Sequence, residues 1–338
     1  MISDNTMSNG QWIVLTSIHH PTPAVKAFAQ MSREGWSVLV VGDVKTPLDW
    51  SVPDVIYLSI QEQHRLFGKL SRNLPYNHYA RKNLGYLYAM MHGATLILDT
   101  DDDNLPYDSF GKNLDSTLSV HLVKGAEWVN IYRYFSQEIV WPRGLPLDEI
   151  QSIGYASIEP VMMDCPVHQF LADEDPDVDA IYRLVLNQPV TFRNAGNFSP
   201  AAGCWVPFNS QNTLFYSAAF SLMYLPCHVS FRMTDIWRSF VAQQALWIKN
   251  KNIVFRPATV RQVRNEHNLM KDFSEEIPGY LGNKKIIQVL RSAAQVIPSS
   301  LPISFIVQSL WQALLEEHFI CEAEMELMNA WFDFMELV

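Results

Sequence analysis

The sequence lacks the patterns of several common protein classes. Its four cysteines include no CxxC pair, which argues against zinc ribbons and thioredoxin-like redox sites. No run of about 20 apolar residues occurs, so we expect no membrane span. The start, MISDNTMSNGQ, has neither a basic nor an apolar region, and it predicts a disordered tail at residues 1–10 rather than a signal peptide. Together these absences predict a cytoplasmic protein with reduced thiols.

Positive charge and the most familiar catalytic motifs are also scarce. The chain has 25 lysines and arginines against 35 aspartates and glutamates, a formal net charge of −10. An acidic surface repels phosphate backbones and anionic lipids, so we expect neither nucleic acid nor a membrane as partner. The chain contains no GxGxxG, GxxxxGK[ST], HExxH or GxSxG motif. Their absence argues against dinucleotide-binding, P-loop, zincin and hydrolase sites.

The chain does contain an alternation of strand and helix patterns in its first hundred or so residues. Short apolar runs at residues 12–18, 36–43, 55–60 and 95–100 predict buried strands, and the segments between them have helical periodicity. This order predicts an α/β fold with a mostly parallel sheet flanked by helices. In open sheets of this kind, ligands bind outside the carboxyl ends of the strands. Polar residues at those ends are therefore the candidates for a site.

The remaining chain is less regular. Residues 128–135 predict a strand, and residues 232–248 predict a helix that starts near good capping residues. From residue 284 onward, apolar residues at helical spacing predict a C-terminal helical extension. Its apolar stripes would pack against the core or against a partner chain, which includes the possibility of a homo-oligomer.

The stretch TLILDTDDDN, residues 95–104, is the most unusual part of the sequence. It brings Asp99, Asp101, Asp102 and Asp103 to the end of a predicted buried strand. Carboxylates this close repel one another, so a cation is expected to offset the repulsion. Mg²⁺ or Mn²⁺ takes carboxylate oxygens together with substrate phosphates. A solvated acidic turn is the alternative without a ligand.

Two chemistries fit this strand end. A haloacid-dehalogenase-type phosphotransferase would use Asp99 as nucleophile and Asp101 two residues later, but Asp103 stands where Thr or Val is expected. A glycosyltransferase of the GT-A type would use a D-x-D motif to hold a metal on a nucleoside diphosphate. The position of this strand after three α/β strands favours the second chemistry. The phosphotransferase and a non-catalytic nucleotide-sugar-binding protein stay open as alternatives.

Several segments, in the same order, resemble the STELLO family of GT-A glycosyltransferases. They are GDVKTPLDW, LSIQEQ, LPYNHYARKNLGYLYAMMHGA, ILDTDDDN, DPDVDAIYRL, RMTDIWRSFVAQ and VRNEHNLMKDFSEE, and they cover roughly residues 10–280. More distantly, the aspartate-bearing strand is similar to that of the reversibly glycosylated polypeptides and UDP-sugar mutases. The resemblance implies that a sugar is transferred from a nucleotide sugar, a UDP-sugar, to an unknown hydroxyl acceptor in a metal-dependent reaction.

The resemblance also implies a division of the chain. Residues 11–283 would form the GT-A domain, with a nucleotide-binding half at 11–104 and an acceptor half at 105–283. Residues 284–338 would lie outside it as the helical extension.

On the donor side, the resemblance implies roles for seven residues. The metal would be bound by Asp101 and Asp103, with His267 closing its site. Asp101 and Asp102 would also face the donor, Asp102 at the sugar or ribose. The nucleobase or ribose would be held by Asp43, with Thr16 beside it, and the diphosphate would be contacted by Arg81.

On the acceptor side, Asp235 would be the general base of an inverting reaction. Trp237 would stack on a sugar face, and Arg183 would contact sugar or acceptor. Two of these residues also have a structural alternative: Asp235 as a helix cap and Trp237 in the core.

Overall fold

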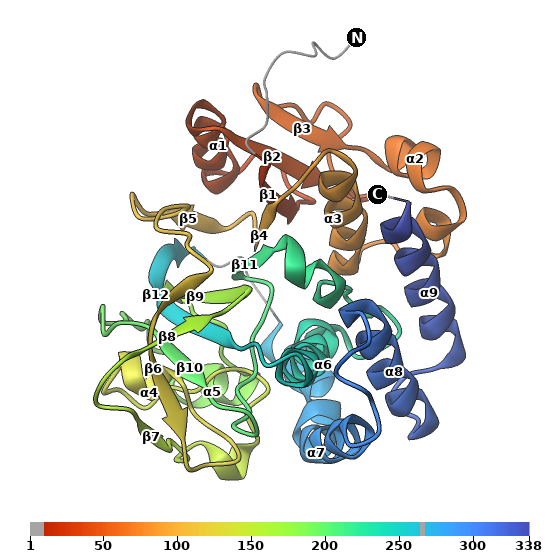
Figure 1. The fold of residues 1–338 in the computed structure, drawn as a ribbon. Helices are drawn as coiled ribbons and strands as arrows, with labels where there is room; N and C mark the ends of the chain where they lie inside the picture. The colour runs from red at the N-terminus through yellow and green to blue at the C-terminus, as the bar shows by residue number, and fades with distance from the viewer. Residues whose placement is uncertain (1–9, 264–267, 338) are drawn as a thin grey trace.

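The chain folds around one mixed β-sheet with helices packed against it (Figure 1). The structure is a computed structural model, and it describes residues 10–263 and 268–337. The elements of the first part are β1 (Gln11–Thr16), α1 (Pro23–Gln30), β2 (Trp36–Val41), β3 (Val55–Leu58), α2 (Ile60–Asn73), α3 (Lys82–Met91) and β4 (Leu96–Thr100).

The first four strands are parallel and lie in the order β3-β2-β1-β4. All four begin and end within about two residues of the predicted runs, because each run is mainly apolar and is followed by polar or turn residues. Helix α3 packs closely on this part of the sheet. A Cβ on Gly85 would lie only 2.6 Å from Val41 and 2.7 Å from Val14, so only glycine permits this approach. Lys82 lies one turn earlier on the same helix face and is thereby brought over the end of β4.

The sheet continues from β4 with strands of both directions. Strand β11 (Asn212–Tyr216) pairs antiparallel with β4, and the order continues β9-β12-β10-β6-β7. The bounds of these further strands are β5 (Asn104–Pro106), β6 (Thr117–Lys124), β7 (Tyr155–Ala156), β8 (Val161–Asp164), β9 (Val167–Asp173), β10 (Phe198–Pro200) and β12 (Ile253–Gln262). The predicted α/β class is therefore confirmed, with a parallel first part and a mixed second part.

The strand predicted at residues 128–135 is wrong. Trp128 forms only an isolated bridge with Trp205, and the segment ends in the short helix α4 (Tyr132–Phe135). Residues 128–132 are all buried, so the mainly apolar run marks an irregular segment packed in the core rather than a strand.

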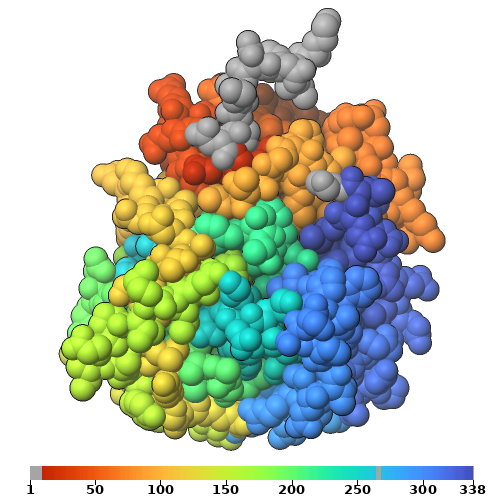
Figure 2. Space-filling view, viewed as in Figure 1, coloured from red at the N-terminus to blue at the C-terminus, as the bar shows by residue number. Residues whose placement is uncertain are grey.

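The later helices are α5 (Ala180–Val185), α6 (Thr234–Ile248), α7 (Leu269–Ala294), α8 (Ile303–Glu316) and α9 (Glu322–Glu336). The predicted C-terminal helices are present, and α7 runs without a break through residue 284. Helix α7 packs on α5 and α6, α8 on α6 and α7, and α9 on α2 and α3. Figure 2 shows this C-terminal part in blue beside the orange segment of α2 and α3.

The apolar faces of these helices belong to the same core as the sheet. Trp311 of α8 and Trp331 of α9 are buried in one cluster with Trp12 of β1. Core packing within the chain therefore accounts for the predicted apolar stripes. Among the helices that the structure describes, none is long and apolar enough to cross a lipid bilayer.

Candidate active site

A cavity opens at the carboxyl ends of β1 and β4, where the alternation of strands and helices predicts a site. This main cavity is lined by Thr16, Tyr79, Asp101, Asp102, Asp103, Arg143, Asp177, Asn209, Ser210, Gln211, Phe231, Arg232, Asp235 and Gln262. A neighbouring hollow shares Thr16, Tyr79, Asp102 and Phe231 with it and adds Ser17, Ile18, His19, Asp43, Lys45, Asn77 and His78. The structure thus brings together six of the predicted site residues: Thr16, Asp43, Asp101, Asp102, Asp103 and Asp235.

Lys82 is the cation that offsets part of the repulsion among the aspartates. Its ammonium nitrogen lies 2.9 Å from Asp99 Oδ1 and 2.8 Å from Asp101 Oδ1. It also donates to the carbonyl oxygens of Thr100 at 2.7 Å and Ser210 at 3.2 Å. Burial would disfavour its charge, but the charges of Asp101 and Asp99 outweigh burial and raise the pKa of Lys82. Lys82 therefore stays protonated behind the cavity.

Asp99 and Asp101 differ in how far their side chains are exposed to solvent. The Asp99 side chain is 0% exposed, whereas that of Asp101 is 37% exposed and lines the main cavity. Asp103 lines the same cavity, and Gln262 Nε2 of β12 donates to its Oδ1 at 3.0 Å. Burial raises the pKa of Asp101 to about 7, with Lys82 opposing the rise and Asp103 adding to it. One lysine thus does not fully compensate these carboxylates.

The donor set at Asp101 and Asp103 fits a hard divalent cation. Both residues offer carboxylate oxygens to one cavity, and added positive charge between them would stabilise the two carboxylates. Mg²⁺ and Mn²⁺ prefer such oxygen ligands. The third predicted ligand, His267, lies outside the residues that the structure describes.

Asp102 lies between the main cavity and the neighbouring hollow and fixes the turn after β4. Ser17 donates its hydroxyl to Asp102 Oδ2 at 2.5 Å, and Thr22 donates to the Asp102 carbonyl at 2.5 Å. Burial raises the pKa of Asp102, and the bond from Ser17 opposes the rise. The ends of β1 and β4 are thereby locked together at the point where the two hollows meet.

Asp43 is held at the floor of the neighbouring hollow. Its Oδ1 accepts from the Val44 amide at 2.7 Å, and its Oδ2 accepts from the His78 amide at 3.2 Å. His78 in turn accepts from the Ala80 amide through Nδ1 at 3.0 Å, which leaves the ring hydrogen on Nε2. Burial lowers the pKa of His78 to about 4. The hollow therefore combines a carboxylate and a neutral imidazole.

His78 makes a pH dependence of stability testable. The unfolded chain binds a proton at this imidazole below pH about 6.5, while the folded chain does so only near pH 4. Acid therefore favours unfolding between these values, by at most about 1.4 kcal/mol per pH unit for this group. We expect His78→Asn, which keeps an acceptor for the Ala80 amide, to reduce the loss of stability from pH 6.5 to 4.5 in urea unfolding. Equal losses in both proteins would contradict this assignment.

Arg143, Asp177 and Asp235 form another part of the wall of the main cavity. The Arg143 guanidinium is 5% exposed and binds both carboxylates. Its Nε and one terminal nitrogen donate to Asp177 at 2.7 and 2.8 Å, and its two terminal nitrogens donate to Asp235 at 3.1 and 3.0 Å. These bonds satisfy the guanidinium and neutralise much of the charge of the wall.

Asp235 opens helix α6 and accepts several further hydrogen bonds. Tyr79 donates its hydroxyl to Oδ1 at 3.1 Å, and Ser210 donates its amide at 3.1 Å and its hydroxyl at 3.2 Å to Oδ2. Burial alone would raise the pKa of Asp235, but the charge and hydrogen bonds of Arg143 outweigh it and hold this pKa well below its usual range. For Asp235 to act as a general base, an acceptor hydroxyl would have to replace one of these donors.

Arg81 does not reach the cavity. It is buried, and Gln63 Oε1 accepts from its Nε at 2.8 Å while the Leu74 carbonyl accepts from a terminal nitrogen at 3.1 Å. Its guanidinium closes the end of α2 instead of facing a diphosphate.

Trp237 and Arg183 are likewise placed in the protein interior rather than in the cavity. Trp237 donates to Asn283 of α7 at 3.0 Å and packs edge-on against Phe319. Arg183 binds Asp175 at 2.9 Å and the Pro176 carbonyl at 2.8 Å. Trp237 therefore has the core role that the sequence left open, and Arg183 binds its own loop.

Lys82 and Arg143 are the main residues that sequence reasoning missed. For Lys82 a signal was present, since it stands one helical turn before Gly85 in the segment preceding β4. For Arg143 there was none, because it lies in the irregular loop between α4 and β7.

Comparison with known proteins agrees with the resemblance of the motifs. A family model described as STELLO glycosyltransferases matches residues 232–338. The chain is 30% identical to "Probable glycosyltransferase STELLO2" of Arabidopsis thaliana over 97% of its own length and 45% of that protein. It is 30% identical to "Probable glycosyltransferase STELLO1" of the same plant over 95% of its length and 44% of that protein.

These matches extend the resemblance to more of the chain, but they cover only part of the relatives. The motifs placed it at roughly residues 10–280, whereas the family model also covers α8 and α9, so the C-terminal helices are part of what is shared. The chain spans a little under half the length of these two curated relatives. The chain is thus related to the STELLO glycosyltransferases over nearly its whole length, and the resemblance predicted from its motifs is confirmed.

Proposed function

We propose that the chain is a metal-dependent glycosyltransferase. It transfers the sugar of a nucleoside diphosphate sugar, a UDP-sugar, to a hydroxyl acceptor. The observation that carries the proposal is the convergence of Asp101, Asp102 and Asp103 with Thr16 at the carboxyl ends of β1 and β4, in a cavity that Asp235 also lines. The relation to STELLO glycosyltransferases supports the reaction class.

The metal would be Mn²⁺ or Mg²⁺, held by Asp101 and Asp103, with His267 as a further predicted ligand. When bound, it would supply positive charge that stabilises the departing diphosphate. Lys82 is not a substitute for it, because its ammonium points to Asp99 and to one oxygen of Asp101 from behind the cavity.

The donor would occupy both hollows. Its nucleoside would enter the neighbouring hollow, where the Asp43 carboxylate can accept hydrogen bonds and the His78 Nε2 hydrogen can be donated. The sugar and diphosphate would extend past Asp102 into the main cavity. Asp102 is one of the four residues that line both hollows, which suits a contact to ribose or sugar hydroxyls.

The acceptor would bind against Asp177, Asp235 and Tyr79. Asp235 would place Arg143, Ser210 and Tyr79 by accepting their hydrogen bonds. It would serve as base when the acceptor hydroxyl takes the place of the Tyr79 hydroxyl at Oδ1. This neutral donor is easier to displace than the charged guanidinium of Arg143, which donates to the same oxygen.

The arrangement disfavours the phosphotransferase alternative. That reaction needs Asp99 as a nucleophile with access to a phosphate ester. Asp99 is 0% exposed, is bound by Lys82 and lies 3.5 Å from a terminal nitrogen of Arg238. Asp99 is not among the residues that line the main cavity.

Calorimetric titration tests the donor proposal. We expect UDP to bind in the presence of Mn²⁺ and to bind much more weakly without the metal. GDP should bind much more weakly than UDP, even with Mn²⁺ present. Asp101→Asn and Asp103→Asn should each weaken metal-dependent UDP binding by about tenfold or more, because each removes a charged oxygen ligand. Turnover of UDP-sugars then separates an enzyme from a non-catalytic binding protein.

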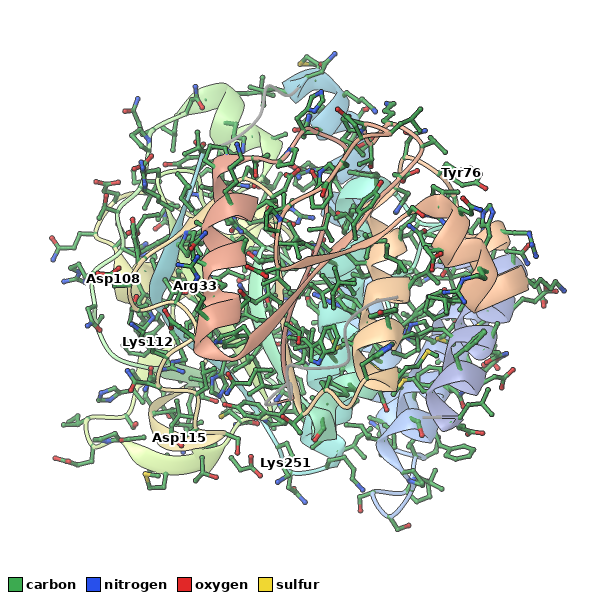
Figure 3. All side chains as sticks on the ribbon, turned by 90° about the horizontal axis from the view of Figure 1, so that it is seen from above. Arg33, Tyr76, Asp108, Lys112, Asp115 and Lys251 are labelled. Atoms are coloured by element: carbon green, nitrogen blue, oxygen red, sulfur yellow. The ribbon has the colours of Figure 1, made fainter. Side chains whose placement is uncertain are left out.

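Asp108→Asn is the matched control for these variants. Asp108 carries the same charge five residues after Asp103, but its side chain points outward at the surface (Figure 3). It should leave UDP binding unchanged. Metal-dependent binding that survives both Asp101→Asn and Asp103→Asn would refute the assigned metal site.

A further inference from the structure

A second group of metal-ligating side chains lies outside the two hollows. Cys227 and His228 belong to the segment between the 3-10 helices Ser217–Leu222 and Phe231–Met233, and Glu324 lies in the first turn of α9. One ligand atom of each side chain lies within 4.8 Å of the others. Cys227 and Glu324 are buried, and the His228 side chain is 38% exposed.

The spacing of these atoms suits a tetrahedral metal. Cys227 Sγ lies 3.6 Å from His228 Nδ1, and His228 Nδ1 lies 3.2 Å from Glu324 Oε2. Ligands at the usual zinc bond lengths are separated by about 3.6 Å for sulfur to nitrogen and about 3.3 Å for nitrogen to oxygen. The contacts that the three side chains now make could therefore be replaced by bonds to one ion.

The charge of Glu324 is an independent reason to expect a cation. Its side chain is 1% exposed, and within residues 10–263 and 268–337 no lysine or arginine forms an ion pair with it. Its ionisable cationic partner in this part of the chain is the imidazole of His228, which carries charge only when protonated. A buried carboxylate with so weak a countercharge is costly. Its partners are the Tyr224 hydroxyl, the amides of Cys227 and His228, and the His228 ring.

We propose that Cys227, His228 and Glu324 bind Zn²⁺, with water in the fourth position. A thiolate, an imidazole and a carboxylate together suit zinc better than Mg²⁺ or Ca²⁺. The amides of Cys227 and His228 hold the Glu324 carboxylate in place for this role. On binding, the Cys227 thiol loses its proton to solvent as the sulfur–zinc bond forms, and neutral His228 donates the Nδ1 lone pair.

The ion would join α9 to the segment that leads into the candidate active site. Phe231 and Arg232, which follow His228 by three and four residues, line the main cavity. Helix α9 also packs on α2 and α3, and the segment that joins those two helices lines the neighbouring hollow. Zinc would therefore stabilise the C-terminal helix and the cavity wall together, without contacting the donor.

Cobalt substitution tests this site. Chelator-treated protein titrated with Co²⁺ should show a thiolate-to-cobalt charge-transfer absorption, which Cys227→Ser should abolish. His228→Ala removes an exposed ligand without opening the core, and it should weaken Co²⁺ binding by about tenfold or more. Zinc should raise the unfolding temperature of the wild type, but much less that of His228→Ala.

Cys321→Ser is the control, because Cys321 is an exposed thiol three residues before Glu324. This variant should keep the absorption band. The proposal is overturned if the wild type shows no band, or if the band survives Cys227→Ser and disappears in Cys321→Ser. UDP binding in the same variants is a separate measurement, so failure of the zinc site would not count against the donor site.

Discussion

Replacement of Lys82 by methionine should destabilise the protein by about 3–5 kcal/mol, which is the typical effect of removing one partner from a buried ion pair. Methionine fills a similar volume but leaves Asp99, which is 0% exposed, with no ammonium at 2.9 Å. Asp101 and two carbonyl oxygens lose the same donor. The free energy of unfolding from urea denaturation measures this loss.

A second substitution separates the charge effect from packing. In the Lys82→Met background, the Asp99 charge is compensated, among the described residues, only by Arg238 at 3.5 Å, so Asp99→Asn should restore part of the lost stability, although in the wild type it should be destabilising. Lys112→Met, at an exposed lysine on the surface (Figure 3), should change stability by less than about 0.5 kcal/mol. A Lys82→Met protein as stable as the Lys112→Met protein would contradict the role assigned to Lys82.

Replacement of Arg143 by methionine should have an effect of similar size, about 3–5 kcal/mol, for the same physical reason. Arg143 is the shared partner of Asp177 and Asp235, and both carboxylates are at least nine-tenths buried. Arg143→Lys should be only a partial replacement, because an ammonium group cannot make the paired bonds to two carboxylates that a guanidinium makes.

The effect of Arg143 variants should be selective between the two walls of the cavity. Donor binding depends on the Asp101–Asp103 wall, so folded Arg143→Lys protein should bind UDP with Mn²⁺ nearly as the wild type does. Sugar transfer should fall strongly, since Asp235 and Asp177 lose their positions. Arg33→Met, at a surface arginine (Figure 3), serves as the control. Unchanged stability and transfer in both Arg143 variants would show that the acceptor wall does not depend on this residue.

The first part of the sheet and the donor wall were predictable because they depend on local patterns. Apolar runs ending at polar turns located β1, β2, β3 and β4 within about two residues. The carboxyl ends of neighbouring parallel strands meet, so Thr16 and Asp101 had to lie near each other. The same reasoning placed Asp43 beside them.

The part of the cavity wall that contains Arg143 and Asp235 was not predictable, because it depends on contacts between distant parts of the chain. Arg143 meets Asp235 across 92 positions of the chain, and nothing in the sequence near either residue indicates the pair. Arg81 and Trp237 illustrate the reverse error. Their residue types suit ligand binding, but helices α2 and α7 supply interior partners, Gln63 and Asn283, which no local pattern shows.

A crystal structure of the protein with UDP and Mn²⁺ tests the central claim most directly, because anomalous scattering locates manganese without assumption. We expect one manganese ion bound by oxygens of Asp101 and Asp103 and by the diphosphate, with the uridine in the hollow beside Asp43 and His78. Manganese and diphosphate found away from these aspartates, or a phosphate bonded to Asp99, would contradict the proposed glycosyltransferase site.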